Sequence, residues 1–488
     1  MKQTTLLISL FILFVQCSDE QRQELLLQHY YAFFQDVKIA TMEHKNLWDK
    51  DLYGPILLVD PQTRKVYSNM SDSEGVLKRS GSIYEGILPI HINISDTEIY
   101  WNGRIWAMLT LPLDLFKKER IDLAAHELFH SNYHLFNDIP PDFANYHLIE
   151  KEARIYMRLE LSALNKTLNS KSEKDLHHHL TNALIFRKYR HSLYPNSDFS
   201  ENMLELGEGL AQYTGLIISG RNKNQMKKCL INRNNYCSRS SSFVRTFAYY
   251  TIPSYGFLLY NKDKKWNKKI TEKSDLTEYI IRTFNIEFPT NLKGTVERIS
   301  NEYGGEKIIR QELKKENLMI VSYENIKHTY IEEPHFEIYF ERMNFGRDME
   351  GIFPFVNIGT FYNKIRITDY WGILTVESGA LICLNWRKVA LTMPLRKDGN
   401  LISGNGWTLK LEDGYSIEMD EFSGNIFLDK EDKNHIPFIL NVLPIIDHDE
   451  IEKLKGIDFY TIISITVLLD SSKVIINTDS LELILKMR

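Results

Sequence analysis

Apolar and polar positions follow a mixed pattern in the first part of the chain. From Ser18 to about Phe34 the apolar residues recur at helical spacing, and residues 54–67 predict two strands around a turn that contains proline. The dipeptide Asn102-Gly103 separates two further strand-like runs and is the strongest short signal for a β-hairpin. We therefore expect a mixed α/β part over residues 18–113, whose last strand, residues 104–111, leads directly into a helix.

The pattern changes near Asp114 and again near residue 328. Long stretches with apolar residues at helical spacing extend to about Tyr260, and the polar, charged stretch 261–327 predicts a helical connector. Beyond it, short runs rich in aromatic and β-branched residues alternate with glycine and aspartate, which is typical of strands. The sequence thus predicts an α+β fold with a mixed part (18–113), a mostly helical domain with its connector (114–327) and a β-rich C-terminal domain (328–488).

Residues 1–17 have the pattern of a signal peptide. A lysine precedes an apolar run over residues 4–15, which is too short to span a bilayer. Cys17 stands where a lipoprotein carries its lipid-modified cysteine, and Ser18-Asp19-Glu20 resembles the acidic start of surface-exposed lipoproteins in some Gram-negative bacteria. We expect an exported outer-membrane or cell-surface lipoprotein that contacts the membrane through Cys17 alone, with release into the periplasm or the medium as the alternative.

Composition narrows the class of protein further. Hydrophobic residues make up 43% and charged residues 25%, the balance of a folded chain, and the net charge of -5 argues against nucleic acid as a partner. Cys229 and Cys237 flank a polar, asparagine-rich segment that we expect to be a loop. In an oxidising compartment they would close a disulfide, and two free thiols are the alternative. Cys383 lies in an apolar run and is expected to be buried.

The chemistry of the chain concentrates in His126-Glu127-Leu128-Phe129-His130, an HExxH motif. Residues four apart lie on one face of a helix, so His126 and His130 can point their imidazoles at one zinc ion, with Glu127 beside it as a general base. His134 continues this face by one more turn, as a group behind the ligands or as a surface histidine. The adjacent His177, His178 and His179 favour a solvated helix start over a metal site.

A catalytic zinc needs a third protein ligand, and spacing alone leaves the choice open. Glu150 follows His130 by 20 positions and Glu208 follows it by 78, with Glu205 a further candidate. The segment Gly207-Glu208-Gly209-Leu210-Ala211-Gln212-Tyr213 resembles the Asn-Glu-Gly-Phe-Ala-x-Tyr segment that supplies the third ligand in aminopeptidase-N-like gluzincins. The spacing of Glu150 is instead similar to that of thermolysin-like enzymes. The resemblance of the segment favours Glu208.

This resemblance to gluzincin zinc metallopeptidases covers about residues 104–260, and it implies the rest of the site. It implies one zinc per chain, a protein or peptide substrate, and strand 104–111 as the edge that binds extended substrate. The helix that contains Tyr250 and Tyr255 resembles the one that supplies an oxyanion-stabilising tyrosine in such enzymes.

The expected function is therefore peptide-bond hydrolysis by a zinc-activated water with Glu127 as the base. Two rival functions stay open: a non-catalytic surface or binding lipoprotein on a peptidase fold, and a zinc hydrolase of esters or epoxides. An intact Glu127 argues against the first rival, and only a substrate screen separates the second.

Overall fold

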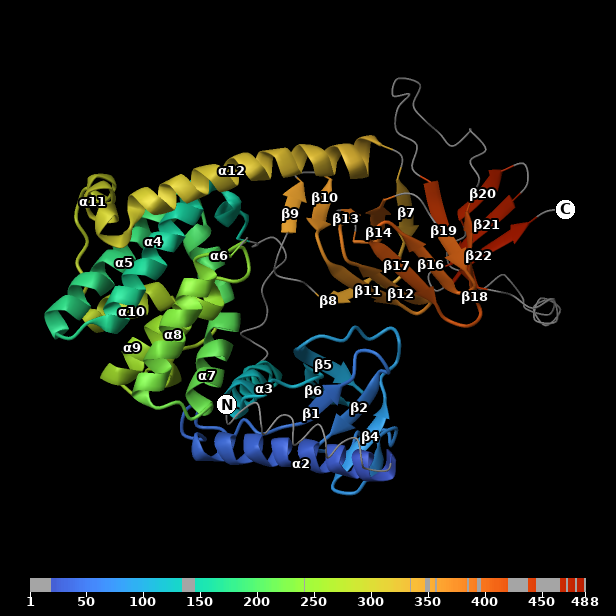
Figure 1. Cartoon of the computed structure of the whole chain (residues 1–488), viewed down its shortest axis with the longest axis horizontal. Helices are drawn as coiled ribbons and strands as arrows, with labels where there is room; N and C mark the ends of the chain where they lie inside the picture. Colours follow the sequence, from blue (N-terminus) through green and yellow to red (C-terminus); the bar gives the residue numbers. More distant parts are fainter. Residues whose placement is uncertain are drawn as a thin grey trace, which may run out of the picture.

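The computed structural model describes residues 19–133, 145–240, 242–333, 335–346, 352–355, 358–383, 386–392 and 396–419, and four later strands within 438–486. The leader, Cys17 and His134 lie outside these residues. The fold is α+β, as the sequence predicts, with a mixed N-terminal part, a helical middle and a β-rich C-terminal part (Figure 1). No helix in the described part combines the length and the apolar character needed to cross a bilayer.

The N-terminal part consists of helix α2 (Asp19–Glu43) and a six-stranded sheet in the order β3-β4-β2-β1-β6-β5. The strands are β1 (Ile56–Val59), β2 (Lys65–Ser68), β3 (Lys78–Ser80), β4 (Ile83–Ile87), β5 (Thr97–Trp101) and β6 (Arg104–Thr110). Strands β5 and β6 form the expected hairpin, in which Asn102 and Gly103 both have the positive φ, 47° and 75°, that a tight two-residue turn requires. The expected pair β1–β2 is also antiparallel.

One expectation about this sheet is wrong. Strand β6 is not an edge, because it pairs with β5 on one side and, in parallel, with β1 on the other. The edge strand beside the helical part is β5. The sequence marks residues 104–111 as a strand, but its neighbours are set by the return of the chain through β2, β3 and β4, which a local pattern does not contain.

Alternation along the strands gives the sheet two apolar faces. Ile56 and Leu58 of β1 and Leu109 of β6 face a core shared with α2 and with the helix that follows the sheet. On the other face Trp106 and Met108 pack beneath the loops of the sheet. The sheet therefore packs against the helix that carries the HExxH motif, and its last strand in the sequence, β6, leads into that helix.

The middle of the chain is helical, as expected. Its helices are α3 (Lys117–Asn132), α4 (Lys151–Asn169), α5 (Glu173–Leu193), α6 (Ser197–Leu204), α7 (Leu210–Ile218), α8 (Lys223–Cys237), α9 (Ala248–Lys262), α10 (Leu276–Phe284), α11 (Leu292–Ile299) and α12 (Gly305–Lys327). Short 3-10 turns are η3 (Tyr146–Ile149), η5 (Trp266–Lys269) and η6 (Ser300–Tyr303), and two π-helical turns are η4 (Glu205–Gly209) and η7 (His328–Glu332).

The segment between Cys229 and Cys237 is helix α8 rather than the expected loop, and both thiols are free. Eight helical positions separate Cα atoms by about 12 Å along the axis, whereas a disulfide needs less than about 7 Å. The disulfide alternative is therefore wrong for this conformation. Cys383, expected to be buried, is only partly so at the end of its strand.

The C-terminal part packs two sheets face to face. One has the order β18-β19-β7-β14-β13-β10-β9 and the other β15-β16-β17-β12-β11-β8, and a shared core contains Ile338 and Val389 from the first and Leu374 and Leu409 from the second. A third sheet has the order β20-β21-β22. The strands are β7 (Phe336–Tyr339), β8 (Asn344–Gly346), β9 (Ile352–Phe355), β10 (Gly359–Tyr362), β11 (Ile365–Asp369), β12 (Gly372–Val376), β13 (Ala380–Cys383), β14 (Lys388–Leu391), β15 (Arg396–Asp398), β16 (Leu401–Gly404), β17 (Trp407–Leu411), β18 (Tyr415–Met419), β19 (Phe438–Pro444), β20 (Thr466–Asp470), β21 (Lys473–Thr478) and β22 (Leu481–Lys486).

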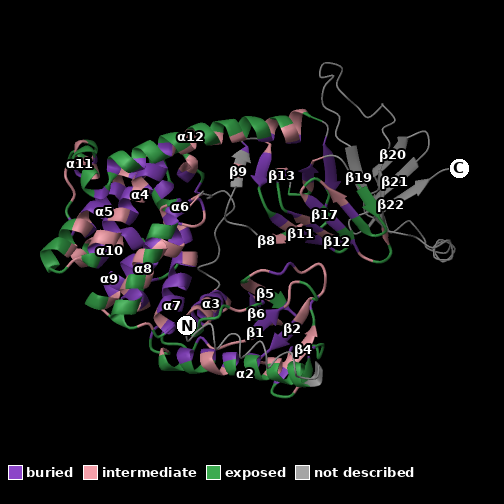
Figure 2. Cartoon of the chain, viewed as in Figure 1, coloured by how far each residue is buried: buried purple, intermediate pink, exposed green. Residues whose placement is uncertain are grey.

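In the described part of the chain, helix α12 and contacts of His91 connect the C-terminal sheets to the rest of the molecule. Helix α12 runs from the helical part to the sheets, and much of its bridging half is exposed (Figure 2). Below it, the backbone oxygen of His91 in the N-terminal part accepts hydrogen bonds from Asn344 and Thr368, both at 3.2 Å. The His91 ring also lies 4.6 Å from that of Tyr370. The C-terminal sheets therefore contact both other parts of the molecule.

Candidate metal centre

Helix α3 buries the HExxH motif almost completely. Ala124, Ala125, Leu128 and Phe129 are fully buried, so α3 is held between the sheet and the helices rather than on the surface. His126 and Glu127 are each 5% exposed, and His130 is 8% exposed. Burying unpaired polar groups costs free energy, so this arrangement indicates a site with a partner for them.

The third acidic group reaches α3 from a π-helical turn. Turn η4 interrupts the continuous helical course from α6 into α7, and such turns occur frequently at functional sites. Two glycines allow the surrounding helices to close on it. A Cβ on Gly209 would lie 2.7 Å from Cβ of Ile252 in α9, and a Cβ on Gly215 would lie 2.4 Å from the backbone oxygen of Asp122 in α3. Close packing of α3, α7 and α9 therefore depends on glycine at both positions.

The structure brings His126, His130 and Glu208 together. The two Nε2 atoms are 3.1 Å apart, and Oε2 of Glu208 lies 3.4 Å from that of His126 and 3.3 Å from that of His130. A tetrahedral zinc ion about 2.0–2.1 Å from each ligand would separate the ligand atoms by about 3.3 Å. The donor set, two imidazoles and one carboxylate, is also one that zinc prefers, so these residues fit a zinc ion, and within the described part of the chain they supply three ligands.

The electrostatics of the centre favour a cation. Burial lowers the pKa of His126, which keeps this ring neutral, the form that binds metal. Burial alone would raise the pKa of Glu208, but the two imidazoles hold it well below its usual value, so this carboxylate is ionised. Burial raises the pKa of Glu127 to about 8, opposed by His130 and reinforced by Glu208 and by two acidic residues near β5, Asp96 and Glu98.

Tyr249 is the tyrosine of this centre, and the sequence analysis missed it. Its hydroxyl donates to Oε2 of Glu208 at 2.6 Å, and its ring stacks on His126 with centroids 5.5 Å apart and planes 4° from parallel. Burial and the charge of Glu208 raise its pKa well above the usual value, so the hydroxyl keeps its proton. The only signal in the sequence was the run of tyrosines in FAYYTIPSYG, which does not indicate which of them faces η4.

The two tyrosines favoured by the sequence lie elsewhere. The hydroxyl of Tyr255 donates to Oε1 of Glu160 at 2.9 Å in a buried ionic cluster. Tyr250 packs against an apolar cluster, with the guanidinium of Arg233 5.6 Å from its ring centroid. An adjacent residue on α9 points about 100° away, and this rotation separates Tyr250 from Tyr249.

The rival third ligands also lie away from the histidines. Glu150 is the N-cap residue of α4, and its side chain is exposed and makes no capping hydrogen bond. Glu205 accepts two hydrogen bonds from Arg187, at 2.9 and 2.7 Å, and one from Thr251 at 2.6 Å. The geometry therefore favours Glu208 among the three glutamates, in agreement with the resemblance of its segment.

The buried ionic cluster is formed by Glu160, Arg187, Arg190, Glu201 and Glu205, none of them more than 1% exposed at its side chain. Arg187 joins Glu160 to Glu205, and Arg190 joins Glu160 to Glu201, all at 2.6–2.9 Å. Because Glu205 begins η4, this cluster anchors the turn that carries Glu208. Removing one partner would leave a buried charge unpaired, which costs about 3–5 kcal/mol.

A second group of two histidines and a glutamate lies on the outside of the helical part. His178 and His179 approach the Glu302 carboxylate at 3.3 and 3.4 Å. Lys166 lies 3.6 Å from the same carboxylate, and Nδ1 of His179 lies 2.8 Å from the Tyr303 hydroxyl. These contacts and the exposure of His178 suit a solvated helix better than a metal site.

No protein family, curated protein or solved structure matches this chain in the comparisons with known proteins. The interpretation of the site therefore depends on its own residues and their geometry.

Proposed function

We propose that this protein is a zinc-dependent metallopeptidase, with one zinc per chain held by His126, His130 and Glu208. The observation that supports this most strongly is the convergence of the three ligand atoms at 3.1–3.4 Å from one another, close to the edge of a tetrahedron around zinc. A buried general base next to them adds the second requirement of a hydrolase. A purely structural zinc site would have a fourth protein ligand, and the described residues supply three.

Zinc in such a site supplies a water of lowered pKa and polarises the scissile carbonyl. Glu127, the residue next to His126 in α3, takes the proton from the attacking water and returns it to the leaving amine. Tyr249 orients the Glu208 carboxylate through its hydroxyl.

The substrate is proposed to be a protein or peptide in extended conformation. The edge strand β5 has an unpaired side in the described sheet and packs against α3, so it can pair with an extended chain running past the motif. The strand proposed to pair with substrate is therefore β5, whereas the sequence analysis expected the strand over residues 104–111, which is β6. We also propose that the protein is exported and anchored through Cys17, a proposal that rests on the leader sequence alone.

The test compares purified wild type with Glu127→Gln. Wild type is expected to contain about one zinc per chain and to cleave an unfolded protein such as reduced casein, with a chelator abolishing cleavage. Glu127→Gln is expected to retain zinc and to lose cleavage by at least a hundredfold, because only the base is removed. Zinc-loaded wild type that hydrolyses an ester but no peptide would exclude the peptidase and favour the esterase alternative.

A further inference from the structure

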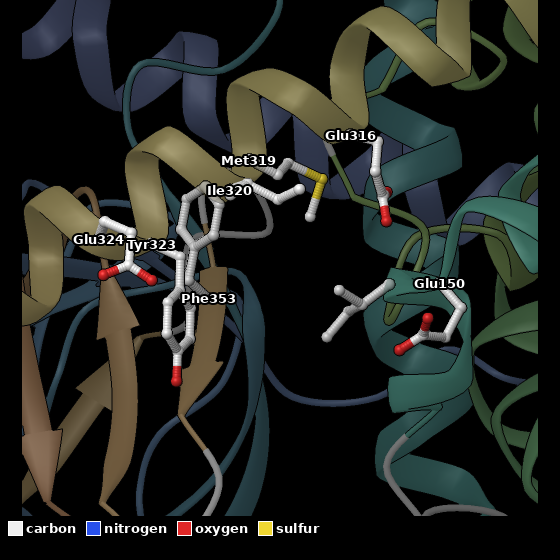
Figure 3. Close-up of a pocket in the computed structure, with 8 residues that line it drawn as sticks. Glu150, Glu316, Met319, Ile320, Tyr323, Glu324 and Phe353 are labelled. Carbon is white, nitrogen blue, oxygen red and sulfur yellow. The ribbon is translucent and has the colours of Figure 1, made fainter.

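A groove opens between the helical part and the C-terminal sheets, away from the metal centre. It is a cavity of about 290 Å³ lined by α12, the end of η3 and β9 (Figure 3). We call it the α12 groove and define it by its lining residues, Ile149, Glu150, Glu316, Met319, Ile320, Tyr323, Glu324 and Phe353.

The charged groups of the α12 groove are all acidic. Glu150 and Glu316 lie together on one side of it (Figure 3), and Glu324 lies farther along α12. The Arg154 guanidinium forms ion pairs with both Glu316, at 2.7 Å, and Glu312, at 2.6 Å. Within the described part of the chain, Glu150 and Glu324 form no ion pair. The groove thus keeps a net negative charge and favours a cationic occupant.

The opposite side of the groove is apolar and exposed. Tyr323 and Phe353 stand there, with Met319 between them and the acidic side (Figure 3). Ile320 in the groove is 57% exposed, and its neighbours Leu318 and Val321, which do not line the groove, extend the exposed apolar surface of α12 beside it at 59% and 58% exposed. Consecutive exposed apolar residues on a helix are costly to leave in water and mark interaction surfaces. The rigid stack of Tyr323 on Phe355, with centroids 4.3 Å apart, holds this side in place.

The α12 groove and helix α9, which carries Tyr249, share one apolar cluster. Ile149, at the groove, packs against a cluster that contains Phe247 and Ala248. These two residues directly precede Tyr249, which hydrogen-bonds the Glu208 carboxylate. A substrate long enough to contact both sites would therefore span this cluster.

We propose that the α12 groove is a secondary docking site for an extended segment of the protein substrate that carries an arginine or lysine beside an aromatic or aliphatic side chain. This inference rests on the proposed peptidase function and names the substrate feature it selects. The basic side chain lies between Glu150 and Glu316, and the apolar side chain packs on Met319 and Tyr323. The groove adds binding energy remote from the scissile bond, so it favours long unfolded substrates over short peptides.

Binding is measured first, without turnover, on full-length Glu127→Gln. Two fluorescent peptides are compared, identical except that one has Leu-Arg-Phe and the other Leu-Glu-Phe at the centre. The arginine peptide is expected to bind about fivefold more tightly, and Glu150→Gln with Glu316→Gln to remove about that factor. Glu306→Gln, at the far end of the same helix, is the matched control and should change nothing. Equal affinity for the two peptides, or equal loss in the control, would overturn the docking site.

Turnover separates this inference from the proposed function. In the otherwise wild-type protein, the Glu150→Gln and Glu316→Gln pair should raise KM for casein about fivefold at unchanged kcat, and should leave cleavage of a short peptide unchanged. Cleavage of casein that is insensitive to the pair would overturn the docking site alone. Groove-dependent binding with no cleavage by wild type would overturn the peptidase alone. A dimer of wild type that dissociates in Ile320→Ser would assign the groove to self-association and also overturn the inference.

Discussion

The crossing of α3 and α7 offers a sharp test of how the metal centre is assembled. At Gly215 a Cβ would lie 2.4 Å from the backbone oxygen of Asp122 and 2.5 Å from its Oδ1, whereas ordinary contacts of a Cβ begin at 3.4 Å. Gly215→Ala must therefore push the two helices about 1 Å apart at this crossing. Asp122 lies one turn before His126, and Gly215 lies two turns after Glu208, so the displacement acts between ligands of the same ion.

The expected magnitude follows from this displacement. Ligand distances at a metal tolerate changes of about 0.2 Å, so a relative shift approaching 1 Å distorts the centre well beyond that range. We expect zinc affinity to fall by about 10- to 100-fold, the usual effect of disturbing the supports of ligands. Overpacking should also cost about 1–3 kcal/mol in the free energy of unfolding.

The assay is competition for zinc between the protein and a fluorescent chelator, with urea unfolding measured in parallel. Gly54→Ala is the matched control, because a Cβ there meets Leu128 of the same helix at 3.5 Å, an ordinary contact. Zinc affinity in Gly215→Ala equal to that of wild type and of the control would show that α3 and α7 do not position the ligands as the structure indicates.

Three further predictions concern single side chains. Glu208→Ala should lose zinc affinity by at least about a hundredfold while Glu150→Ala retains it, measured by metal analysis after dialysis, and the reverse result would move the third ligand to Glu150. Tyr249→Phe should weaken zinc binding about tenfold, whereas Tyr255→Phe should leave zinc binding and turnover unchanged and lower the free energy of unfolding by about 1–2 kcal/mol; equal zinc affinity in the two variants would contradict the assignment of Tyr249. Burial lowers the folded-state pKa of His126, so in the metal-free protein this group contributes its full stability above about pH 6.5 and loses that contribution as pH falls through the folded pKa. Urea unfolding in the presence of a chelator, as a function of pH, checks this. A pH dependence that His126→Gln leaves unchanged would exclude it.

The sequence predicted the features that depend on neighbouring residues. The hairpin β5–β6 follows from Asn102-Gly103 between alternating runs, and α3 follows from apolar residues at helical spacing around the motif. The α+β organisation followed in the same way, because helical and strand periodicities occupy different stretches of the chain. Where the periodicity was weak, as in the asparagine-rich segment that forms α8, polar composition was mistaken for a loop.

The features that depend on distant packing were not predictable in the same way. The pairing of β6 with β1 joins strands about 50 positions apart, so no local pattern shows that β6 is internal. Tyr249 faces Glu208 because Ile252 of α9 packs directly against Gly209, and these two residues are more than 40 positions apart in the sequence. An error of one residue on a helix rotates a side chain by about 100°, which is enough to replace Tyr249 by Tyr250.

The π-helical turn η4 couples the buried ionic cluster to the metal centre, because it carries one glutamate of each. Glu205, at its start, is fixed by Arg187 inside the protein, and Glu208, three positions later, faces the two histidines. Deleting a single residue from this turn would restore ordinary α-helical winding and swing one of the two carboxylates about 100° off its target. The length of the turn is therefore as much a determinant of the centre as the identity of the glutamate within it.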